Sequence, residues 1–307
     1  MLIICLAHMN HTIHTIDLNF LGHPNGICAY LVETSIGPIL IETGPHSTLD
    51  TLTEGIEKVG YKKEDIKHVF ITHIHLDHAG AAWCFAEHGA RVYLHPFGYR
   101  HMNDPAKLLA SAKMIYKDKM DFLWGTLKPI PADQLIEVGH SEQVSIGEFD
   151  ISAWHTPGHA KHHISWLIGQ DLFTGDVAGV CINDGPVIPP CPPPDINIED
   201  WESSLQVIEE LEAVQAFYLT HFGKVTNIDQ HLAKLRESLE AYSSFAKPYY
   251  DAGKTAEEML PDFTKFVNEY LTSHGMSQSD ALAYEGANPS DMSVAGLLRY
   301  WHKRSQA

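Results

Sequence analysis

Residues 69–80 read VFITHIHLDHAG. The apolar start of this stretch predicts a buried strand, and three imidazoles and a carboxylate follow it: His73, His75, Asp77 and His78. In an extended or tightly looped segment alternate side chains point the same way, so His73 and His75 can reach one metal ion together. Asp77 and His78 lie just past the bend and can bind a metal ion at a second position. Four donors at the carboxyl end of a strand therefore predict a metal site rather than a His-rich surface loop.

Three further donors follow apolar, strand-like runs later in the chain. His159 lies in TPGH, Asp176 in FTGD and His221 in YLTHFG. Functional side chains collect on the loops that follow strands, because a rigid scaffold positions them there. We therefore expect the donors from all four segments to meet in one metal centre.

The order His-x-His-x-Asp-His, followed by these three donors, resembles the signature of the metallo-β-lactamase superfamily over most of the chain. The resemblance implies an α/β fold, the four-layer αβ/βα sandwich of that superfamily, with a C-terminal helical segment added. The ligand sets that it implies are His73, His75 and His159 for a first ion, Asp77, His78 and His221 for a second, and Asp176 as the bridge between them.

Such a pair of divalent ions shares a water and lowers its pKa, which makes a hydroxide nucleophile without any Ser or Cys. The resemblance implies that Asp77 is the catalytic residue, which orients this hydroxide and receives its proton. Zinc suits the mixed nitrogen and oxygen ligation, and iron and manganese occupy similar sites within the superfamily. The leading hypothesis is a binuclear metal-dependent hydrolase that acts on a small thioester, lactone or ester.

Two alternatives stay open from the sequence. The first is a mononuclear iron oxidoreductase of the persulfide dioxygenase type, which resembles glyoxalase II, another member of the superfamily, but binds one metal. In such a protein, residues equivalent to Asp77, His78 and His221 can persist although a second ion is absent. A non-catalytic binding protein on the same fold usually shows ligand loss, and no ligand is lost here. Metal analysis separates the hydrolase from the iron oxidoreductase.

The composition limits the binding partners and the cellular compartment that we expect for this protein. The net charge of −18 repels long polyanions, which argues against nucleic acid and favours a small-molecule substrate. The five Cys residues are odd in number and scattered, which predicts free thiols in a reducing compartment. Residues 2–7 are apolar but too few for a signal peptide or a membrane span. We expect a cytoplasmic protein with no membrane contact, and a homo-oligomer is compatible with the sequence.

Apolar periodicity predicts the order of the elements. The strands are expected over residues 12–18, 27–33, 38–42, 69–71, 90–94, 144–146, 149–154, 163–168, 172–174 and 216–220. The helices before the C-terminal segment are expected over residues 47–59, with Ser47 as N-cap, 79–88 and 200–215. The first three strands predict an antiparallel meander, and the strand, helix and strand around residue 79 predict a parallel crossover.

Two regions lie outside this core pattern. Residues 1–225 are expected to form the catalytic core and residues 226–307 a helical segment, which glyoxalase II-type members use to line the substrate pocket. The alternative for this segment is a stabilising cover, and its turn-rich break at residues 286–292 is the candidate for reaching the metals. Residues 101–125 are expected to be helical, either packed on the domain or acting as a lid or dimer contact.

Several polar residues have a less certain place. Residues 42–44 read ETG where the superfamily usually has Asp-Thr-Gly, so Glu42 leaves the support of the ligand loop in doubt. His162 or His163 could orient a ligand or touch substrate, with packing as the alternative, and the same holds for His95. Cys191 has no visible partner and is expected to be inert.

Overall fold

Two six-stranded sheets face each other in the computed structural model, which describes residues 11–306. The first sheet has the spatial order β1 (Ile13–Asp17), β2 (Cys28–Thr34), β3 (Gly37–Ile41), β4 (His68–Phe70), β5 (Arg91–Leu94) and β6 (Leu135–Glu137). The second sheet has the order β12 (Gly223–Val225), β11 (Ala216–Leu219), β10 (Asp171–Phe173), β9 (Ile164–Ile168), β8 (Phe149–His155) and β7 (Gln143–Ile146).

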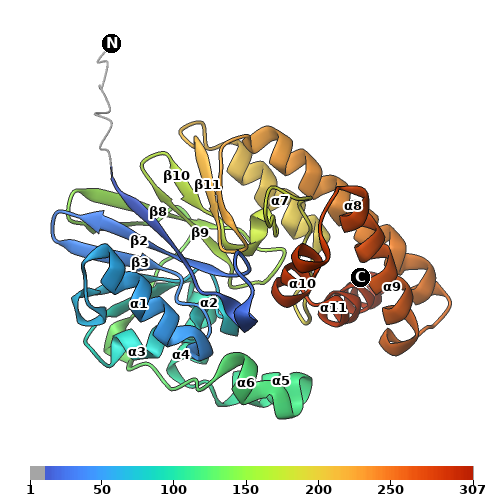
Figure 1. The fold of residues 1–307 in the computed structure, drawn as a ribbon, viewed down its shortest axis with the longest axis horizontal. Helices are drawn as coiled ribbons and strands as arrows, with labels where there is room; N and C mark the ends of the chain where they lie inside the picture. The colour runs from blue at the N-terminus through green and yellow to red at the C-terminus, as the bar shows by residue number, and fades with distance from the viewer. Residues whose placement is uncertain (1–10, 307) are drawn as a thin grey trace.

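Helices cover the outer face of each sheet, which completes the four-layer αβ/βα sandwich expected from the sequence (Figure 1). The helices of the first half are α1 (Leu49–Val59), α2 (Leu76–Ala79), α3 (Ala82–Ala86), α4 (Pro96–Asn103), α5 (Ala106–Tyr116) and α6 (Met120–Trp124). The helices of the second half are α7 (Ile198–Glu209), α8 (Ile228–Asp251), α9 (Ala256–Ser273), α10 (Gln278–Ala287) and α11 (Ser290–Arg304).

Strand direction follows the predicted pattern. β1, β2 and β3 form the antiparallel meander, and β3, β4, β5 and β6 pair in parallel. The parallel crossover predicted around the motif strand β4 is therefore confirmed. Because parallel strands place their carboxyl ends at one edge of a sheet, the loops after β3, β4 and β5 lie together there.

Alternation along the strands explains how one strand contributes to two cores. In β2, Tyr30 and Val32 pack between the sheets, whereas Ala29 and Leu31 pack against the helices of the first sheet. Successive side chains of a strand point to opposite faces, so a strand that is buried on both faces is apolar throughout. A third cluster joins the outer face of the second sheet to α7, α8 and the C-terminal helices, and includes Trp201, Leu235 and Leu297.

Three local predictions were wrong. The helix expected over residues 200–215 is α7, which ends at Glu209. The helix expected over residues 79–88 is two short helices, α2 and α3, because the chain turns between them and the Ala81 amide donates to the Gly44 carbonyl at 3.0 Å. Ser47 is not the N-cap of α1. A 3-10 turn, His46–Thr48, precedes α1, Thr48 takes the cap position, and the Ser47 hydroxyl donates to the Leu123 carbonyl at 2.6 Å.

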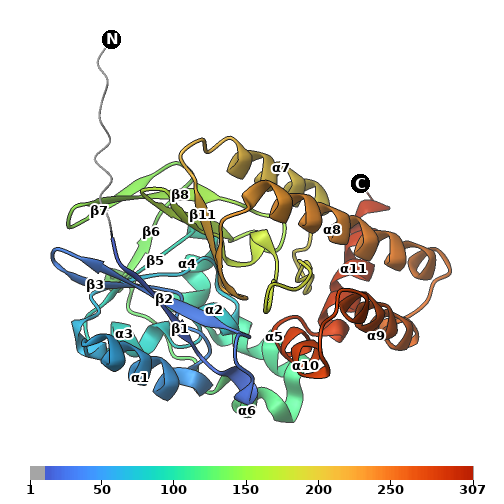
Figure 2. The ribbon, with the colours of Figure 1, turned by 45° about the horizontal axis from the view of Figure 1, so that its top comes forward.

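The proline-rich loop at residues 189–194 lies between the second sheet and the last helix. α11 packs on this loop through Gly296, where an added Cβ would stand 1.9 Å from the Cys191 carbonyl oxygen. α11 also packs on α8 and α9, so the C-terminal helices surround one side of the second half of the sandwich (Figure 2). The division of the chain at residue 225 stays a prediction.

The structure tests the predictions on membrane spans and free thiols for the residues that it describes. None of the helices within residues 11–306 is long and apolar enough to cross a membrane. The expected free thiols are confirmed for Cys28, Cys84, Cys181 and Cys191. The fifth cysteine, Cys5, and the apolar run at residues 2–7 lie outside the described residues.

We predict that Gly296→Ala destabilises the fold. The new methyl group meets backbone rather than a flexible side chain, so α11 must move off the proline-rich loop, at a cost of roughly 1–3 kcal/mol. Chemical unfolding of the full chain measures this loss. Gly286→Ala in α10 is the matched control, because a Cβ there meets nothing within 4 Å. Equal stability of both variants and the parent would contradict the close contact.

Candidate metal centre

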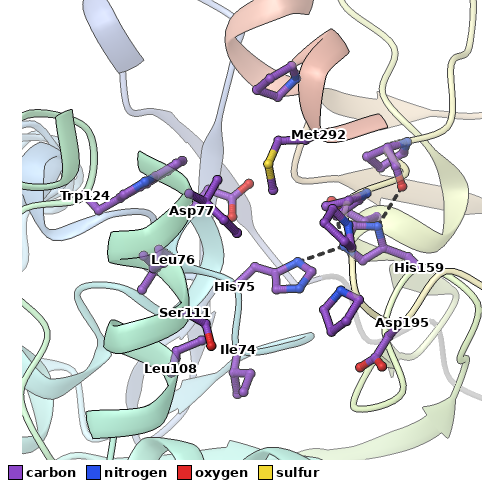
Figure 3. A pocket seen from close by; sticks show the side chains of 18 of the residues that line it. Ile74, His75, Leu76, Asp77, Leu108, Ser111, Trp124, His159, Asp195 and Met292 are labelled. Carbon is purple, nitrogen blue, oxygen red and sulfur yellow. Dashed lines mark hydrogen bonds and ion pairs between the residues drawn. The ribbon is translucent and has the colours of Figure 1, made fainter. Parts of the chain in front are cut away.

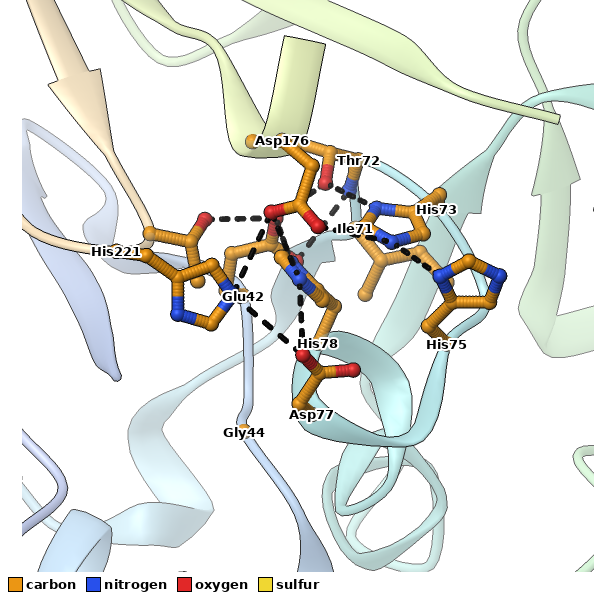
Figure 4. Close-up of polar contacts among 12 residues, drawn as sticks. Glu42, Gly44, Ile71, Thr72, His73, His75, Asp77, His78, Asp176 and His221 are labelled. Atoms are coloured by element: carbon orange, nitrogen blue, oxygen red, sulfur yellow. Dashed lines mark hydrogen bonds and ion pairs between the residues drawn. The ribbon is translucent and has the colours of Figure 1, made fainter. Parts of the chain in front are cut away.

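All seven predicted ligands lie at carboxyl ends of strands and meet at one edge of the sandwich. His73, His75, Asp77 and His78 follow β4, and His159 lies in the loop between β8 and β9. Asp176 follows β10 and His221 follows β11. Figure 4 shows His73, His78 and His221, from two separate segments, around Asp176. The structure thus brings together every residue that the sequence pattern selected.

One group of donors is built from three imidazoles. The His75 Nδ1 atom lies 3.0 Å from the His73 Nε2 atom and 2.9 Å from the His159 Nε2 atom. The Oδ2 atom of Asp176 faces the same group, 3.2 Å from the His159 Nε2 atom and 4.0 Å from the His73 Nε2 atom. Three nitrogens and one carboxylate oxygen therefore point at one small volume.

A second group lies on the other side of Asp176. The Oδ2 atom of Asp77 is 3.5 Å from the His78 Nε2 atom and 3.4 Å from the His221 Nε2 atom. The Oδ1 atom of Asp176 is 3.2 Å and 3.4 Å from the same two nitrogens. Each oxygen of Asp176 thus faces a different donor group, which is the arrangement that a bridging carboxylate requires.

Metal ions fit these donors on two grounds. The His78 Nε2, His221 Nε2 and Asp176 Oδ1 atoms are buried and have no hydrogen-bond partner among residues 11–306, and buried polar atoms are normally satisfied. Four tetrahedral ligands at about 2.0–2.2 Å from a zinc ion stand about 3.3–3.6 Å apart, close to the spacing of these donors. That the seven residues bind metal stays a prediction.

Hydrogen bonds on the far side of each ring fix the tautomer. The Nδ1–H group of His159 donates to the Pro190 carbonyl at 2.9 Å, and that of His221 donates to the Gly26 carbonyl at 2.8 Å. A carbonyl can only accept, so the lone pair of each ring lies on Nε2 and points at the donor group. The sequence contains no side-chain signal for such backbone partners, and neither Pro190 nor Gly26 was predicted to support the site.

Glu42 supports the ligand loop, which settles the doubt raised by its extra methylene. It is buried and holds a left-handed backbone, with φ of 63°. Its Oε1 atom accepts from the Nδ1–H group of His78 at 3.1 Å and from the Thr72 hydroxyl. The Thr72 oxygen in turn accepts from the Nδ1–H group of His73 at 3.0 Å. One carboxylate therefore orients a ligand of each donor group.

His163 holds the backbone at Asp176 in place. Its Nδ1–H group donates to the Thr156 hydroxyl at 2.9 Å, and its Nε2 atom accepts from the Asp176 amide at 3.2 Å. Gly175 makes this approach possible, because a Cβ there would stand 2.7 Å from the His163 Nε2 atom. His163 is thus a positioning residue, one of the two roles foreseen for it.

The other uncertain residues separate into pocket and packing roles. His162 lines the pocket beside the donors, with its ring centroid 5.5 Å from that of His75. His95 caps α4 by accepting from the Phe97 amide and stacks on His155, so it packs rather than binds. Burial raises the pKa of the Cys191 thiol, which keeps it protonated, as expected of an inert cysteine.

The electrostatics of the site favour cations. Burial and the His159 imidazole lower the pKa of His75 to about 3, so this ring stays neutral and free to bind. Burial opposes the ionisation of Asp176, but the imidazoles of His78 and His159 hold its pKa below the usual range. Burial likewise opposes the protonation of His78, yet Asp176 and Asp77 raise its pKa well above the usual range. A metal must displace that proton, so binding weakens as the pH falls.

A cavity of about 300 Å³ opens directly onto the donors. Its walls come from the turn after β4, from α5 and α6, from the proline-rich loop and from the α10–α11 junction. Figure 3 shows the Met292 side chain reaching into this pocket between Asp77 and His159. The apolar lining residues are Ile74, Leu76, Leu108, Ala112, Ile115, Tyr116, Trp124, Pro190, Pro192, Pro193, Pro194, Ala287, Pro289 and Met292.

This lining answers two questions that the sequence left open. Residues 101–125 pack on the core of the first sheet, as one alternative expected, and also contribute Leu108, Ala112 and Trp124 to the pocket wall. The C-terminal segment contributes Asn288 and Met292, both from the turn-rich break at residues 286–292 that was the candidate for reaching the metals. Asn288 also donates to the Pro189 carbonyl at 3.1 Å, which ties the break to the proline-rich loop.

Comparison with known proteins gives one consistent result. Residues 24–221 match the family model described as the metallo-beta-lactamase superfamily. A metallo-beta-lactamase fold-containing protein of Sulfurisphaera tokodaii is 29% identical over 210 residues, which cover 64% of this chain and 75% of that protein. An N-acyl homoserine lactonase of Bacillus sp. is 27% identical over 181 residues, which cover 50% of this chain and 64% of the lactonase.

A solved structure extends the likeness of fold to the C-terminal helices. The metallo-beta-lactamase family protein of Thermus thermophilus superposes with a TM-score of 0.66 and 20% identity. The superposition covers 95% of this chain and 94% of that protein. The arrangement of core and C-terminal helices therefore recurs as one fold.

We predict that Glu42→Gln weakens metal binding roughly 10–100-fold, because the amide offers one acceptor fewer to Thr72 and His78 and carries no charge. Competition with a chromophoric chelator measures the affinity. Glu33→Gln is the control, since the Glu33 side chain is 40% exposed and bonds to His14 at 2.6 Å. An unchanged metal affinity of Glu42→Gln would show that Glu42 does not support the ligands.

Proposed function

Because the chain belongs to the metallo-beta-lactamase superfamily and is a metal-dependent hydrolase, we propose that it hydrolyses a small thioester, lactone or ester with an apolar acyl part, using two divalent ions. The observation that carries this proposal is the position of Asp176. Its two oxygens face two donor groups, and the cavity beside them is lined mostly by apolar side chains.

Zinc is the proposed metal. The donors are imidazole nitrogens and carboxylate oxygens, with no thiolate among them, and this set suits zinc, with iron and manganese as alternatives. When bound, such ions lower the pKa of a shared water and stabilise an oxyanion. His73, His75 and His159 would hold one ion, Asp77, His78 and His221 the other, and Asp176 both.

The protein's own side chains supply orientation and proton handling. Asp77 belongs to the second donor group and also lines the cavity, with 19% of its side chain exposed. Burial opposes its ionisation, but the His78 and His221 imidazoles hold its pKa well below the usual range. Its carboxylate is therefore ionised and placed to orient the attacking group and to accept a proton from it.

The cavity supports an acyl substrate. Leu108, Ala112 and Met292 offer apolar surface to a chain and exclude water around the scissile bond. A lactone is one member of this class, and the similar Bacillus proteins are named N-acyl homoserine lactonases. That likeness spans about half of this chain, so the substrate comes to it only as a proposal.

We also propose a cytoplasmic location and a small-molecule partner. The free thiols of Cys28, Cys84, Cys181 and Cys191 support a reducing compartment, and the charge of −18 disfavours nucleic acid. Met114 and Phe122 are more than 70% exposed on α5 and α6, which is compatible with a homo-oligomer.

Metal quantification combined with a substrate panel tests the proposal. We expect about two ions per chain and hydrolysis of at least one acyl thioester, lactone or ester. Asp77→Asn should lower kcat by about 10²-fold or more with a smaller change in KM, because the amide cannot accept the proton. About one iron per chain with oxygen uptake would instead support the persulfide dioxygenase alternative and overturn the hydrolase proposal.

A second prediction concerns the acyl cavity. Met292→Trp fills space in the pocket and should lower kcat/KM roughly tenfold for decanoyl substrates while butanoyl substrates change little, because each buried methylene contributes about 0.8 kcal/mol. Met114→Trp is the matched control, since Met114 is 73% exposed on the outside of α5. The same loss for both acyl lengths would place the acyl chain elsewhere.

A further inference from the structure

The end of the pocket beside the proline-rich loop carries two cations from the last helix. Pro192, Pro193, Pro194 and Asp195 line the cavity. The Pro194 carbonyl accepts from the Arg299 Nε atom at 3.2 Å and from the Lys303 Nζ atom at 2.5 Å. α11 therefore holds both cationic groups at the edge of the wall that Asp195 occupies.

The opposite wall carries cations from α4 and α5. Lys107 and His101 line the same cavity, and the Arg100 Nε atom donates to the His101 ring at 3.3 Å. Figure 3 shows Asp195 on one side of the pocket and Leu108 and Ser111 of α5 on the other. Lys161, in the loop that carries His159, is near enough to Lys303 to help lower the pKa of its ammonium group.

We call Arg100, Lys107, Lys161, Arg299 and Lys303 the basic mouth. Burial, Arg100 and Lys107 lower the pKa of His101, and Asp195 opposes them. Burial, Arg299 and Lys161 lower the pKa of Lys303, and Asp195 again opposes them. His101 and Lys303 therefore each lie near other cations, and Asp195 influences both groups.

The basic mouth is a local exception to the charge of the chain. The net charge is −18, yet none of these five cations has a carboxylate within ion-pair distance among residues 11–306. The carboxylates that line the cavity are Asp77 and Asp176 at the donors and Asp195 beside the proline-rich loop. Arg304 is different, because it pairs with Glu199 at 2.6 Å.

We propose that the basic mouth binds an anionic group, a phosphate or a carboxylate, at the end of the substrate away from its apolar acyl chain. This rests on the proposed function, and it narrows the substrate to an amphiphilic acyl anion. An apolar cavity selects the acyl part, and clustered unpaired cations attract and orient the charged part. A neutral acyl compound would fill the cavity and leave the mouth unused.

Thioether probes, which cannot be hydrolysed, test the proposed anion site by binding alone. S-octyl coenzyme A carries phosphates, S-octylglutathione carries carboxylates, and S-octyl-N-acetylcysteamine carries neither. Calorimetry with the metal-loaded full chain should give at least about tenfold tighter binding of one anionic probe than of the neutral probe, with the preference shrinking as salt screens the mouth. The better anionic probe identifies phosphate or carboxylate. Equal binding of all three probes would overturn the proposal.

Charge variants locate the effect. The triple variant Lys107→Gln, Arg299→Gln, Lys303→Gln should weaken the anionic probe about tenfold and leave the neutral probe within about twofold. Asp195→Asn should act in the opposite direction and strengthen the anionic probe. The control variant removes as many charges from exposed helix positions away from the pocket: Lys113→Gln, Lys234→Gln and Lys265→Gln.

The outcomes separate this inference from the proposed function. If the control variant weakens the anionic probe as much as the mouth variant, only net charge matters and the basic mouth is not a site. The single variant Lys107→Gln separates loss of charge from loss of packing. It removes a charge without breaking a hydrogen bond, because the Lys107 ammonium group makes none within residues 11–306. Tight anionic binding without hydrolysis of any acyl compound would retain the binding site and reject the hydrolase substrate.

Discussion

The carboxylate of Asp176 is the group on which the rest of the site depends. It is buried, and an isolated buried carboxylate is costly unless charges or donors surround it. Its oxygens face two groups of imidazoles that come from strands of both sheets. The sandwich therefore has to hold the carboxyl ends of β4, β8, β10 and β11 at one edge, because only there can four distant segments reach one carboxylate.

Residues that contact the donors hold this arrangement in place. Glu42 accepts from His78 and Thr72, His163 accepts from the Asp176 amide, and backbone carbonyls accept from His159 and His221. The side-chain contacts restrict the rotation of the rings, and the His163 contact restricts the backbone at Asp176. Rings that are already oriented lose less entropy on binding, which is why such outer contacts tune metal affinity. The longer side chain of Glu42 reaches its partners from a left-handed backbone position.

The pocket is built from parts that the core does not need for its ligands. α5 and α6 form one wall, and the proline-rich loop with α11 forms another. None of these segments contains one of the seven donors, although only α11 follows all of them in the chain, and α5, α6 and the proline-rich loop lie between donors. Both added walls bring apolar side chains to the interior, and both bring cations to the edge, through Lys107 on α5 and Arg299 on α11.

The sequence by itself determined the order of the strands along the chain, the parallel crossover and the seven donors, because strand alternation and ligand spacing are local patterns. It misjudged the helix after the motif and the cap at Ser47, where the Gly44 and Leu123 carbonyls compete for local groups. The roles of Glu42 and His163, and the place of Lys107 beside the pocket, were decided only by the tertiary structure. Their partners lie far away in the chain, and no local period records which distant atoms will share a carboxylate, a cavity or a charge field.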